Sequence, residues 1–284
     1  HGDMSLEITM VVLLAAIFNA SWNAIIKVSG DRIAVMAVIT LLGSLVSVFA
    51  LPFVALPDPA SWPLLGLAIL IHTAYHFCLP MAYHYGDFGQ VYPIARGSAP
   101  LLVTLGAAAF AGEMLGFLPL LGVLFLGVGV MSLAFDTSTG ITRNPRAILL
   151  ALGTGAFIAS YTLVGGLGAR QAGSVLGFAV LLTLGNGLLT FAIALIWKAK
   201  EIKRVISSNL APAIVGGGMQ VGAYWIVIWA MAYAPLGMVS ALRETSVLFA
   251  ALISTIILKE GFGVWRFVSS GLIACGIALT RCKP

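Results

Sequence analysis

Two arginines lie inside long apolar segments of the sequence, where charged side chains are rare. Arg96 stands about eight residues into one segment and Arg243 about seven into another, near the middle of a helix that crosses ~30 Å of hydrocarbon. An arginine at that depth costs ~2.5–3.5 kcal/mol on insertion scales, so each must face a cavity or a partner. The planar guanidinium suits a carboxylate. Either arginine could bind the carboxylate of an amino acid, or be held by Glu244, by another span-end carboxylate or by helix C-terminal carbonyls.

Aromatic and imidazole side chains share a helical face in the segment before Arg96. Three- and four-residue spacing brings together His72, Tyr75, His76, Leu79 and Tyr83. The next segment adds Tyr92 one turn before Arg96. Such a wall would stack on an aromatic or apolar side chain at ~0.5–1.5 kcal/mol per ring pair. Interfacial anchoring is the alternative, and it fits Tyr85 and Tyr233 better than the deeper Tyr75 and His76.

Other apolar segments carry further polar candidates. The predicted ligand-contacting set is completed by Trp22 and Asn23, which share a face with Asn19, and by Tyr161, Gln220 and Tyr224. Intramembrane amides also serve as interhelical hydrogen bonds worth ~0.6 kcal/mol on average, which is the alternative role. Pro80, Pro93 and Pro100 are predicted hinges because proline removes a backbone hydrogen bond, although a static kink would leave the same pattern.

The amino-acid composition indicates that these segments lie in a membrane rather than in water. Of 284 residues, 60% are apolar and 9% charged, with a mean hydropathy of +1.06, which excludes a soluble chain. The formal charge of +5 comes from Lys and Arg beside the ends of apolar segments, so no nucleic-acid partner is expected. The three cysteines form no disulfide framework. We expect no cofactor and no metal, because the pair His72 and His76 lacks further ligands nearby.

The elements that must position these residues are transmembrane helices. Apolar windows between breakers predict an all-α polytopic membrane protein with ten spans: Leu6–Lys27, Ile33–Leu56, Trp62–Tyr85, Phe88–Ala111, Leu115–Phe135, Arg146–Ala169, Val175–Trp197, Leu210–Tyr233, Leu236–Leu258 and Val264–Thr280. The connections are short apart from 136–145 and the basic stretch 198–209. Any function must therefore sit within the bundle.

The two halves of the sequence resemble each other. A shift of 147 residues overlays three pairs, namely Arg96 on Arg243, Glu113 on Glu260 and Gly116 on Gly263. The predicted repeats, 4–136 and 143–284, hold five spans each, and an odd number of crossings makes the second repeat enter from the opposite face. Inverted repeats around a central cavity are typical of secondary transporters.

This pattern resembles the EamA repeat of the drug/metabolite transporter superfamily. The resemblance rests on ten short-looped spans in two repeats, in which Gly112-Glu113 and Lys259-Glu260 precede Gly-rich spans. The aromatic-rich segment 72–100 is similar to bacterial exporters of aromatic and other amino acids. The resemblance implies a multi-pass protein of the bacterial inner membrane that exports small amphipathic amino acids by alternating access. An exporter of drugs or other metabolites is the alternative, and a monomer is the simplest expectation.

Two acidic residues shared by the repeats have two possible roles. Glu113 and Glu260 stand where the fifth and tenth helices should begin, so capping by the helix dipole is favoured over proton coupling. Glu244 adjoins Arg243, but neighbours in sequence do not face each other on a helix, so their partners should come from elsewhere. We expect no enzyme, since no serine nucleophile has an evident base, and no channel, since rings of charge or carbonyls are missing.

Two arguments about sidedness disagree. The family pattern implies that both termini lie in the cytoplasm. The positive-inside rule places them outside, because the termini-bearing face holds three basic residues and the other face ten: Lys27, Arg32, Arg143, Arg146, Lys198, Lys200, Lys203, Arg204, Lys259 and Arg266. The orientation in the membrane therefore stays open.

Overall fold

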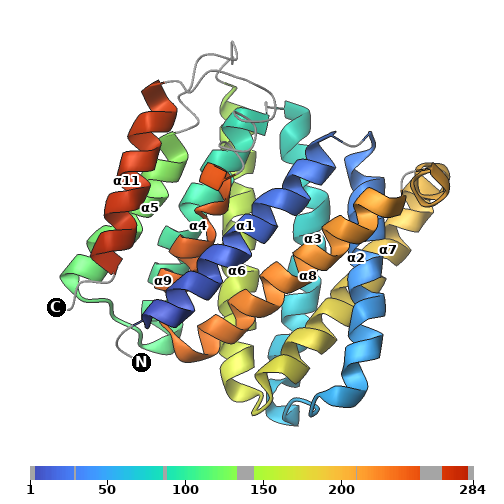
Figure 1. Cartoon of the computed structure of the whole chain (residues 1–284), viewed down its shortest axis with the longest axis horizontal. Coiled ribbons are helices and arrows are strands. Elements are labelled where there is room, and N and C mark those ends of the chain that lie inside the picture. Colours follow the sequence, from blue (N-terminus) through green and yellow to red (C-terminus); the bar gives the residue numbers. More distant parts are fainter. Residues whose placement is uncertain are drawn as a thin grey trace.

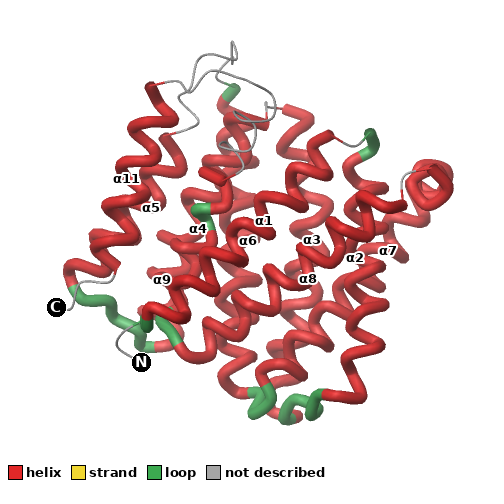
Figure 2. Tube along the Cα trace, in the orientation of Figure 1, coloured by secondary structure: helices red, strands yellow, loops and turns green. Residues whose placement is uncertain are grey.

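A computed structural model describes residues 4–28, 30–85, 88–132, 144–208, 210–249 and 264–280. These residues form helices joined by short loops, with no strand among them (Figure 2). The helices are α1 (Leu6–Val28), α2 (Arg32–Ala50), α3 (Trp62–Tyr85), α4 (Phe88–Ala111), α5 (Phe117–Ser132), α6 (Pro145–Gln171), α7 (Val175–Ser208), α8 (Leu210–Tyr233), α9 (Leu236–Arg243) and α11 (Val264–Thr280), with 3-10 turns at Leu51–Phe53 and Pro59–Ser61. The predicted bounds of α3, α4, α8 and α11 are confirmed.

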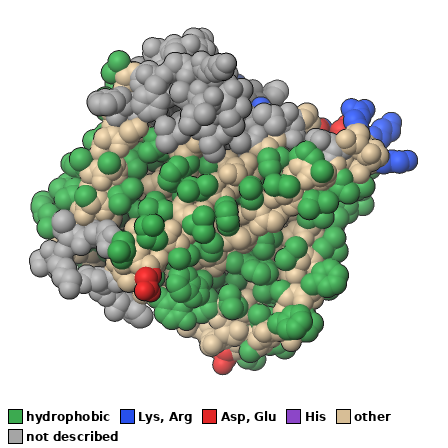
Figure 3. Space-filling model, in the orientation of Figure 1, with side chains coloured by type: hydrophobic (Ala, Val, Ile, Leu, Met, Phe, Trp, Pro, Cys, Tyr) green, Lys and Arg blue, Asp and Glu red, His purple; other side chains and the backbone are tan. Residues whose placement is uncertain are grey.

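The chain is a multi-pass membrane protein. Seven of the described helices are long and apolar enough to cross a membrane, and α5 and α11 are shorter apolar helices. Apolar side chains cover most of the visible outer face of the bundle, while lysine and arginine gather where α7 ends (Figure 3). A surface of this kind suits a lipid environment, because hydrocarbon solvates apolar side chains. Hydrocarbon offers no hydrogen bonds, and the helices satisfy their own backbone groups.

The predicted ninth span is interrupted in the structure. α9 ends at Arg243, Glu244 and Thr245 form a turn, and the chain is helical again over 246–249, while 250–258 lie outside the described residues. The break follows from local bonds: the Thr245 amide and hydroxyl both donate to the Leu242 carbonyl, at 3.1 and 2.6 Å. Such i to i−3 bonds tighten a helix into a 3-10 turn. Apolar periodicity alone does not reveal this break.

The predicted seventh span is longer than expected. α7 continues through the basic stretch to Ser208, with a kink at Lys198 where φ is −129° and ψ is 28°. Beyond the kink Ile202 is buried against α2 and α8, whereas Lys200, Lys203 and Arg204 are exposed. The basic stretch is therefore an amphipathic helix turned away from the span, and its end is seen along its axis at the right of Figure 1.

Helices at matching places in the two halves pack against each other. α2 packs on α7, α5 on α11 and α4 on α9, while α1 packs on α8 as α6 does on α3. The partners α5 and α11 run in opposite senses, as do α2 and α7, and α1 begins at the edge where α11 ends (Figure 1). Exchange of the two halves would preserve this set of contacts. The inverted repeat itself, with its boundaries at 4–136 and 143–284, stays a prediction.

Glycines let α5 and α11 approach closely. A Cβ built on Gly122 would lie 2.8 Å from the Gly276 carbonyl oxygen, and one on Gly276 would lie 2.8 Å from the Gly122 carbonyl oxygen. Neither position accepts a larger residue without separation of the helices. Membrane helices associate through such close backbone contact because lipid offers no hydrophobic driving force between them.

Candidate functional site

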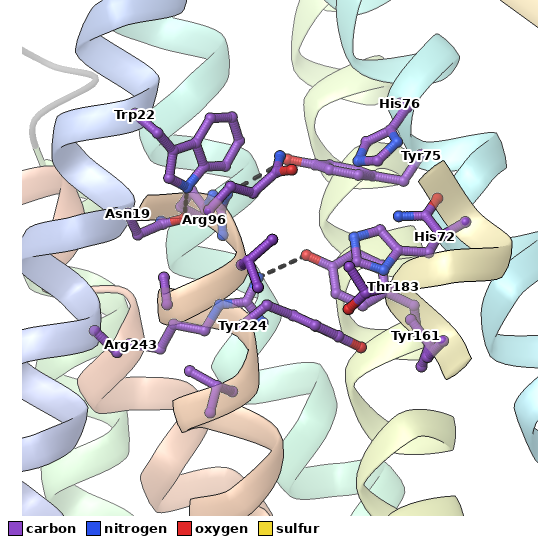
Figure 4. A pocket seen from close by; sticks show the side chains of 17 residues that line it. Asn19, Trp22, His72, Tyr75, His76, Arg96, Tyr161, Thr183, Tyr224 and Arg243 are labelled. Atoms are coloured by element: carbon purple, nitrogen blue, oxygen red, sulfur yellow. Dashed lines mark hydrogen bonds between the residues drawn. The ribbon is translucent and has the colours of Figure 1, made fainter. Parts of the chain in front are cut away.

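A pocket lies in the middle of the helix bundle. Its volume is about 620 Å³, counting the part open to solvent, and it is lined by α1, α3, α4, α6, α7, α8 and α9. The structure brings eight of the predicted ligand-contacting residues to its wall: Trp22, Tyr75, His76, Arg96, Tyr161, Gln220, Tyr224 and Arg243. Figure 4 shows how residues from α1 face those of α3 and α6 across the two arginines. Spans far apart in sequence therefore share one site.

Three predicted contact residues are not placed at the pocket. Asn23 is absent from the lining, and its amide donates to the Asn19 carbonyl of its own helix at 2.7 Å. The side chains of Tyr83 and Tyr92 lie outside those that the structure describes. Of the predicted hinges, Pro93 and Pro100 stand within a continuous α4, and the side chain of Pro80 in α3 is also outside the described set. Their hinge role stays a prediction.

Arg96 connects the pocket to the second half of the chain. Its side chain is buried, its Nη1 lies 3.5 Å from Oε1 of Glu244, and its Nη2 donates to the Tyr75 hydroxyl at 3.4 Å. The sequence left two roles open, a ligand-binding arginine and an arginine held by Glu244. In the structure Arg96 lines the pocket and also contacts Glu244, so its position is compatible with both roles.

Arg243 occupies the last residue of α9. Its Nη2 donates to the Tyr161 hydroxyl at 2.7 Å and its Nη1 to the Thr162 hydroxyl at 3.2 Å, both from α6. Its Nε is 4.0 Å from Glu244 Oε1, a contact between sequence neighbours that the helix break permits. The partners from elsewhere that the sequence predicted are thus Tyr161 and Thr162. A cation at a helix C-terminus is also favoured by the helix dipole.

Aromatic rings form one side of the pocket. The His72 ring stacks on Tyr161 with centroids 4.1 Å apart and planes 5° apart, and its centroid is 5.1 Å from that of Tyr224. The Tyr75 ring lies 5.4 Å from Tyr161. Within the described part of the chain, His72 Nδ1 and the Tyr224 hydroxyl are buried without a hydrogen-bond partner. A buried polar atom without a partner is costly, so these two atoms are candidates for ligand contacts.

No residue of α7 was among the predicted contact residues. Asn186 and Thr183 of α7 reach the pocket. Asn186 Oδ1 accepts from the hydroxyls of Thr73 and Thr190, each at 3.2 Å, and Thr190 Oγ1 lies 3.1 Å from His76 Nδ1. Because the Thr190 hydroxyl donates to Asn186, a neutral His76 carries its proton on Nδ1. An asparagine inside an apolar segment was the available signal for this chain of bonds.

Aliphatic packing closes the pocket toward the termini. On that side α1, α4, α8 and α9 converge in one core cluster, which includes Val12, Val103, Ala230, Leu236 and Val239. These residues lie three to seven positions from the nearest pocket-lining residue of the same helix, on the side of the termini. The pocket is therefore separated from the termini-bearing face by a packed layer.

A second ion cluster lies beyond this layer, and we call it the terminal cluster. Glu113 Oε1 is 2.5 Å from Arg170 Nη1, and Glu113 Oε2 accepts from the Leu236 amide at 3.0 Å. Arg170 also donates to the carbonyls of Met231 and Ala234, at 2.9 and 3.0 Å. The prediction that Glu113 caps α5 is wrong, since α5 begins only at Phe117 and the carboxylate caps α9 instead. Glu260 lies outside the described residues.

Comparison with known proteins identifies a family for the second half of the chain. The family model described as "EamA-like transporter family" matches residues 145–282. Residues 145–282 belong to the EamA-like transporter family. The predicted membership in the drug/metabolite transporter superfamily is thus confirmed, and the EamA family consists of transporters rather than enzymes. The narrower resemblance to exporters of aromatic amino acids stays a prediction.

Solved structures share the fold of nearly the whole chain. One, titled "Crystal structure of protein", matches with a TM-score of 0.78 and 19% sequence identity, covering 96% of this chain and 94% of that chain. At that identity the likeness concerns the fold. No curated protein matches the chain.

Proposed function

We propose that this EamA-like protein is a secondary transporter that exports amino acids, with a preference for aromatic and other small amphipathic ones. The observation that carries the proposal is the pair of buried arginines, Arg96 and Arg243, at one aromatic-lined pocket inside a membrane bundle. Cations in a membrane interior are costly and mark ligand or ion pathways. We place the protein in a bacterial inner membrane as part of the same proposal.

The pocket offers a complementary group for each part of such a substrate. The guanidinium groups of Arg96 and Arg243 suit the carboxylate. The rings of Tyr75, Tyr161 and Trp22 suit an aromatic side chain, which prefers offset or edge contacts with them. The ammonium group would donate to the buried, unpartnered acceptors described above, His72 Nδ1 and the Tyr224 hydroxyl.

Alternating access is supported by the way the halves meet. The pocket is closed toward the termini by the aliphatic core cluster, so a substrate must enter or leave from the opposite side in this conformation. The helix pairs α2–α7, α5–α11 and α4–α9 place equivalent helices of the two halves in contact. Exchange of conformation between the halves would open the termini side and close the other.

Uptake and release in proteoliposomes test the proposal. Vesicles loaded with labelled phenylalanine, tryptophan or threonine should release label faster with the protein than without it. The same panel measured with and without a pH gradient reveals whether protons are coupled. A protein that moves an organic cation but none of the three amino acids would be an exporter of drugs or other metabolites.

A matched control uses the arginine outside the pocket. Arg170→Ala removes a guanidinium from the terminal cluster, whereas Arg96→Ala removes one from the pocket wall. If the order of substrates changes in the first variant and is preserved in the second, the proposed site is wrong.

A further inference from the structure

We propose that Glu244 sets how many negative charges the pocket accepts, so that the transporter binds ligands presenting one carboxylate to Arg96 and Arg243 and discriminates against ligands presenting two. This inference rests on the proposed function, in that it takes the pocket as a carboxylate site. It adds a charge rule and a residue that enforces it. Glu244 acts through the arginines and is a positioning residue.

Glu244 lies behind the arginines and outside the pocket wall. Its side chain is 0% exposed, and Oε1 is shared by Arg96 Nη1 at 3.5 Å and Arg243 Nε at 4.0 Å. Arg96 and Arg243 line the pocket, whereas Glu244 is absent from its lining. We call these three residues the pocket cluster. A ligand would meet the two guanidinium groups with the carboxylate on their far side.

Glu244 forms long ion pairs with the two arginines. Ion pairs at 3.5 and 4.0 Å are longer than the ~2.7–2.9 Å of strong charge-assisted bonds. Within the described residues, Oε2 of Glu244 is buried and has no hydrogen-bond partner. The terminal cluster contrasts with this, because Arg170 and Glu113 meet at 2.5 Å. Glu244 therefore neutralises one positive charge of the pocket cluster without a short bond to either arginine.

The charge rule follows from the low dielectric around the pocket. The three residues carry two positive charges and one negative charge, so a bound ligand whose only charged group is one carboxylate brings their sum to zero. A second carboxylate would leave a net negative charge in the membrane interior, where an uncompensated charge is expensive. Removal of the Glu244 charge should shift the balance by one and admit a second carboxylate.

Calorimetric titration of the purified full chain tests this rule. Three probes share a phenyl ring and differ in charge: 3-phenylpropanamide with no carboxylate, 3-phenylpropionate with one and benzylmalonate with two. The wild-type protein should bind the monocarboxylate most tightly. In Glu244→Gln the affinity ratio of dicarboxylate to monocarboxylate should rise about tenfold or more, since a unit charge a few ångströms away in a protein interior has effects of that order.

Two matched variants separate charge from shape. Glu244→Asp keeps the charge and should keep the wild-type preference. Glu113→Gln makes the same chemical change in the terminal cluster and should leave the affinity ratio unchanged. A ratio that moves equally in Glu113→Gln and Glu244→Gln would overturn the inference, because general destabilisation would then explain both.

Further outcomes decide the inference even if Glu244→Gln does not fold. Arg243→Gln lowers the charge by one, so binding should shift from the monocarboxylate toward the uncharged amide, and the double variant with Glu244→Gln should restore the wild-type order. Equal binding of mono- and dicarboxylate by the wild-type protein overturns the charge rule. Binding in the expected order without movement across vesicles overturns the transport proposal and supports the charge rule.

Discussion

Two ion clusters join the halves of this protein, and their geometry differs. In the terminal cluster Glu113 meets Arg170 at 2.5 Å and caps α9, while Arg170 also holds two carbonyls of the second half. In the pocket cluster Arg96, Arg243 and Glu244 meet at 3.5 and 4.0 Å beside an open volume. A short ion pair between helices fixes their packing, whereas longer ion pairs at a pocket wall keep two cationic side chains beside space that a ligand can occupy.

The largest expected effect comes from the pocket cluster. Arg96→Ala should lower amino-acid transport by about tenfold to hundredfold, since a hydrogen bond to a charged group contributes ~1.5–3 kcal/mol. Expression should persist. The measurement is initial release from proteoliposomes with the amount of protein matched. Undiminished transport in Arg96→Ala would assign this arginine a structural role and end the contrast between the clusters.

The opposite result is expected for the terminal cluster. Arg170→Ala should lower stability by about 2–3 kcal/mol, because it leaves the Glu113 carboxylate and two carbonyls without their donor. Thermal unfolding in detergent measures the loss, and Lys203→Ala on the exposed face of α7 serves as the control. The order in which substrates are bound should remain that of the wild type. A variant of normal stability but altered substrate order would contradict the structural assignment.

A hydroxyl deletion sharpens the comparison within the pocket. Tyr161→Phe keeps the ring that stacks on His72 but removes the acceptor of the 2.7 Å bond from Arg243. We expect about tenfold weaker binding of carboxylate probes. Tyr75→Phe should have a smaller effect, because its bond from Arg96 is 3.4 Å long. Calorimetry compares the two variants, and a larger loss in Tyr75→Phe would reverse the ranking.

The smallest effect is expected where an ion pair is exposed to water. Lys198 Nζ donates to Asp31 at 2.7 Å, at the kink of α7. Burial raises the pKa of the Asp31 carboxyl, but bonds from Lys198 and the Ala34 amide lower it by more, so the pKa lies below 3.8. Because the pKa of Asp31 is lower in the folded state than in the unfolded state, the ionised carboxylate stabilises the folded protein above pH 3.8. This stabilisation is lost as the pH falls through the lower, folded-state pKa.

Asp31→Asn tests this sign. The variant should be less stable than the wild type by under about 1 kcal/mol at neutral pH, because the pair is partly exposed. The difference should persist at pH 5 and shrink as the pH falls below 3.8, which thermal unfolding at several pH values measures. A difference that grows on acidification would mean that the pKa is raised instead.

Much of the fold could be predicted because hydrocarbon imposes a simple rule on sequence. The bounds of α3, α4, α8 and α11 agree with the apolar windows, since each span is bounded by breakers or charges. The rule gave no signal for the break after Arg243, which depends on the bonds of Thr245 to Leu242. It also missed the amphipathic end of α7, where Ile202 packs on the bundle while the basic side chains face outward.

The residues of the candidate site that could be predicted are those whose burial in a membrane is energetically costly. Arg96, Arg243 and the ring-bearing face of α3 stand out because such residues are expensive in a membrane interior. Asn186 and Thr183 are cheaper polar groups and gave a weaker signal, although they complete the wall. Asn23 was predicted together with Trp22, but it is absent from the pocket lining and its amide donates to the Asn19 carbonyl. Helical spacing does not tell which of two neighbouring polar side chains bonds to its own backbone.

The amino-acid sequence determined that this chain crosses a membrane many times, that its halves share a pattern, and that two arginines need partners within it. Those conclusions depend on local composition and spacing. Only the tertiary structure decided that Glu244 stands between those arginines, that Glu113 caps α9 of the other half, and that α7 lines the pocket. Some of these contacts join residues 100 or more positions apart, and the contact between Arg243 and Glu244 depends on the break at the end of α9. All of them are set by how whole helices pack.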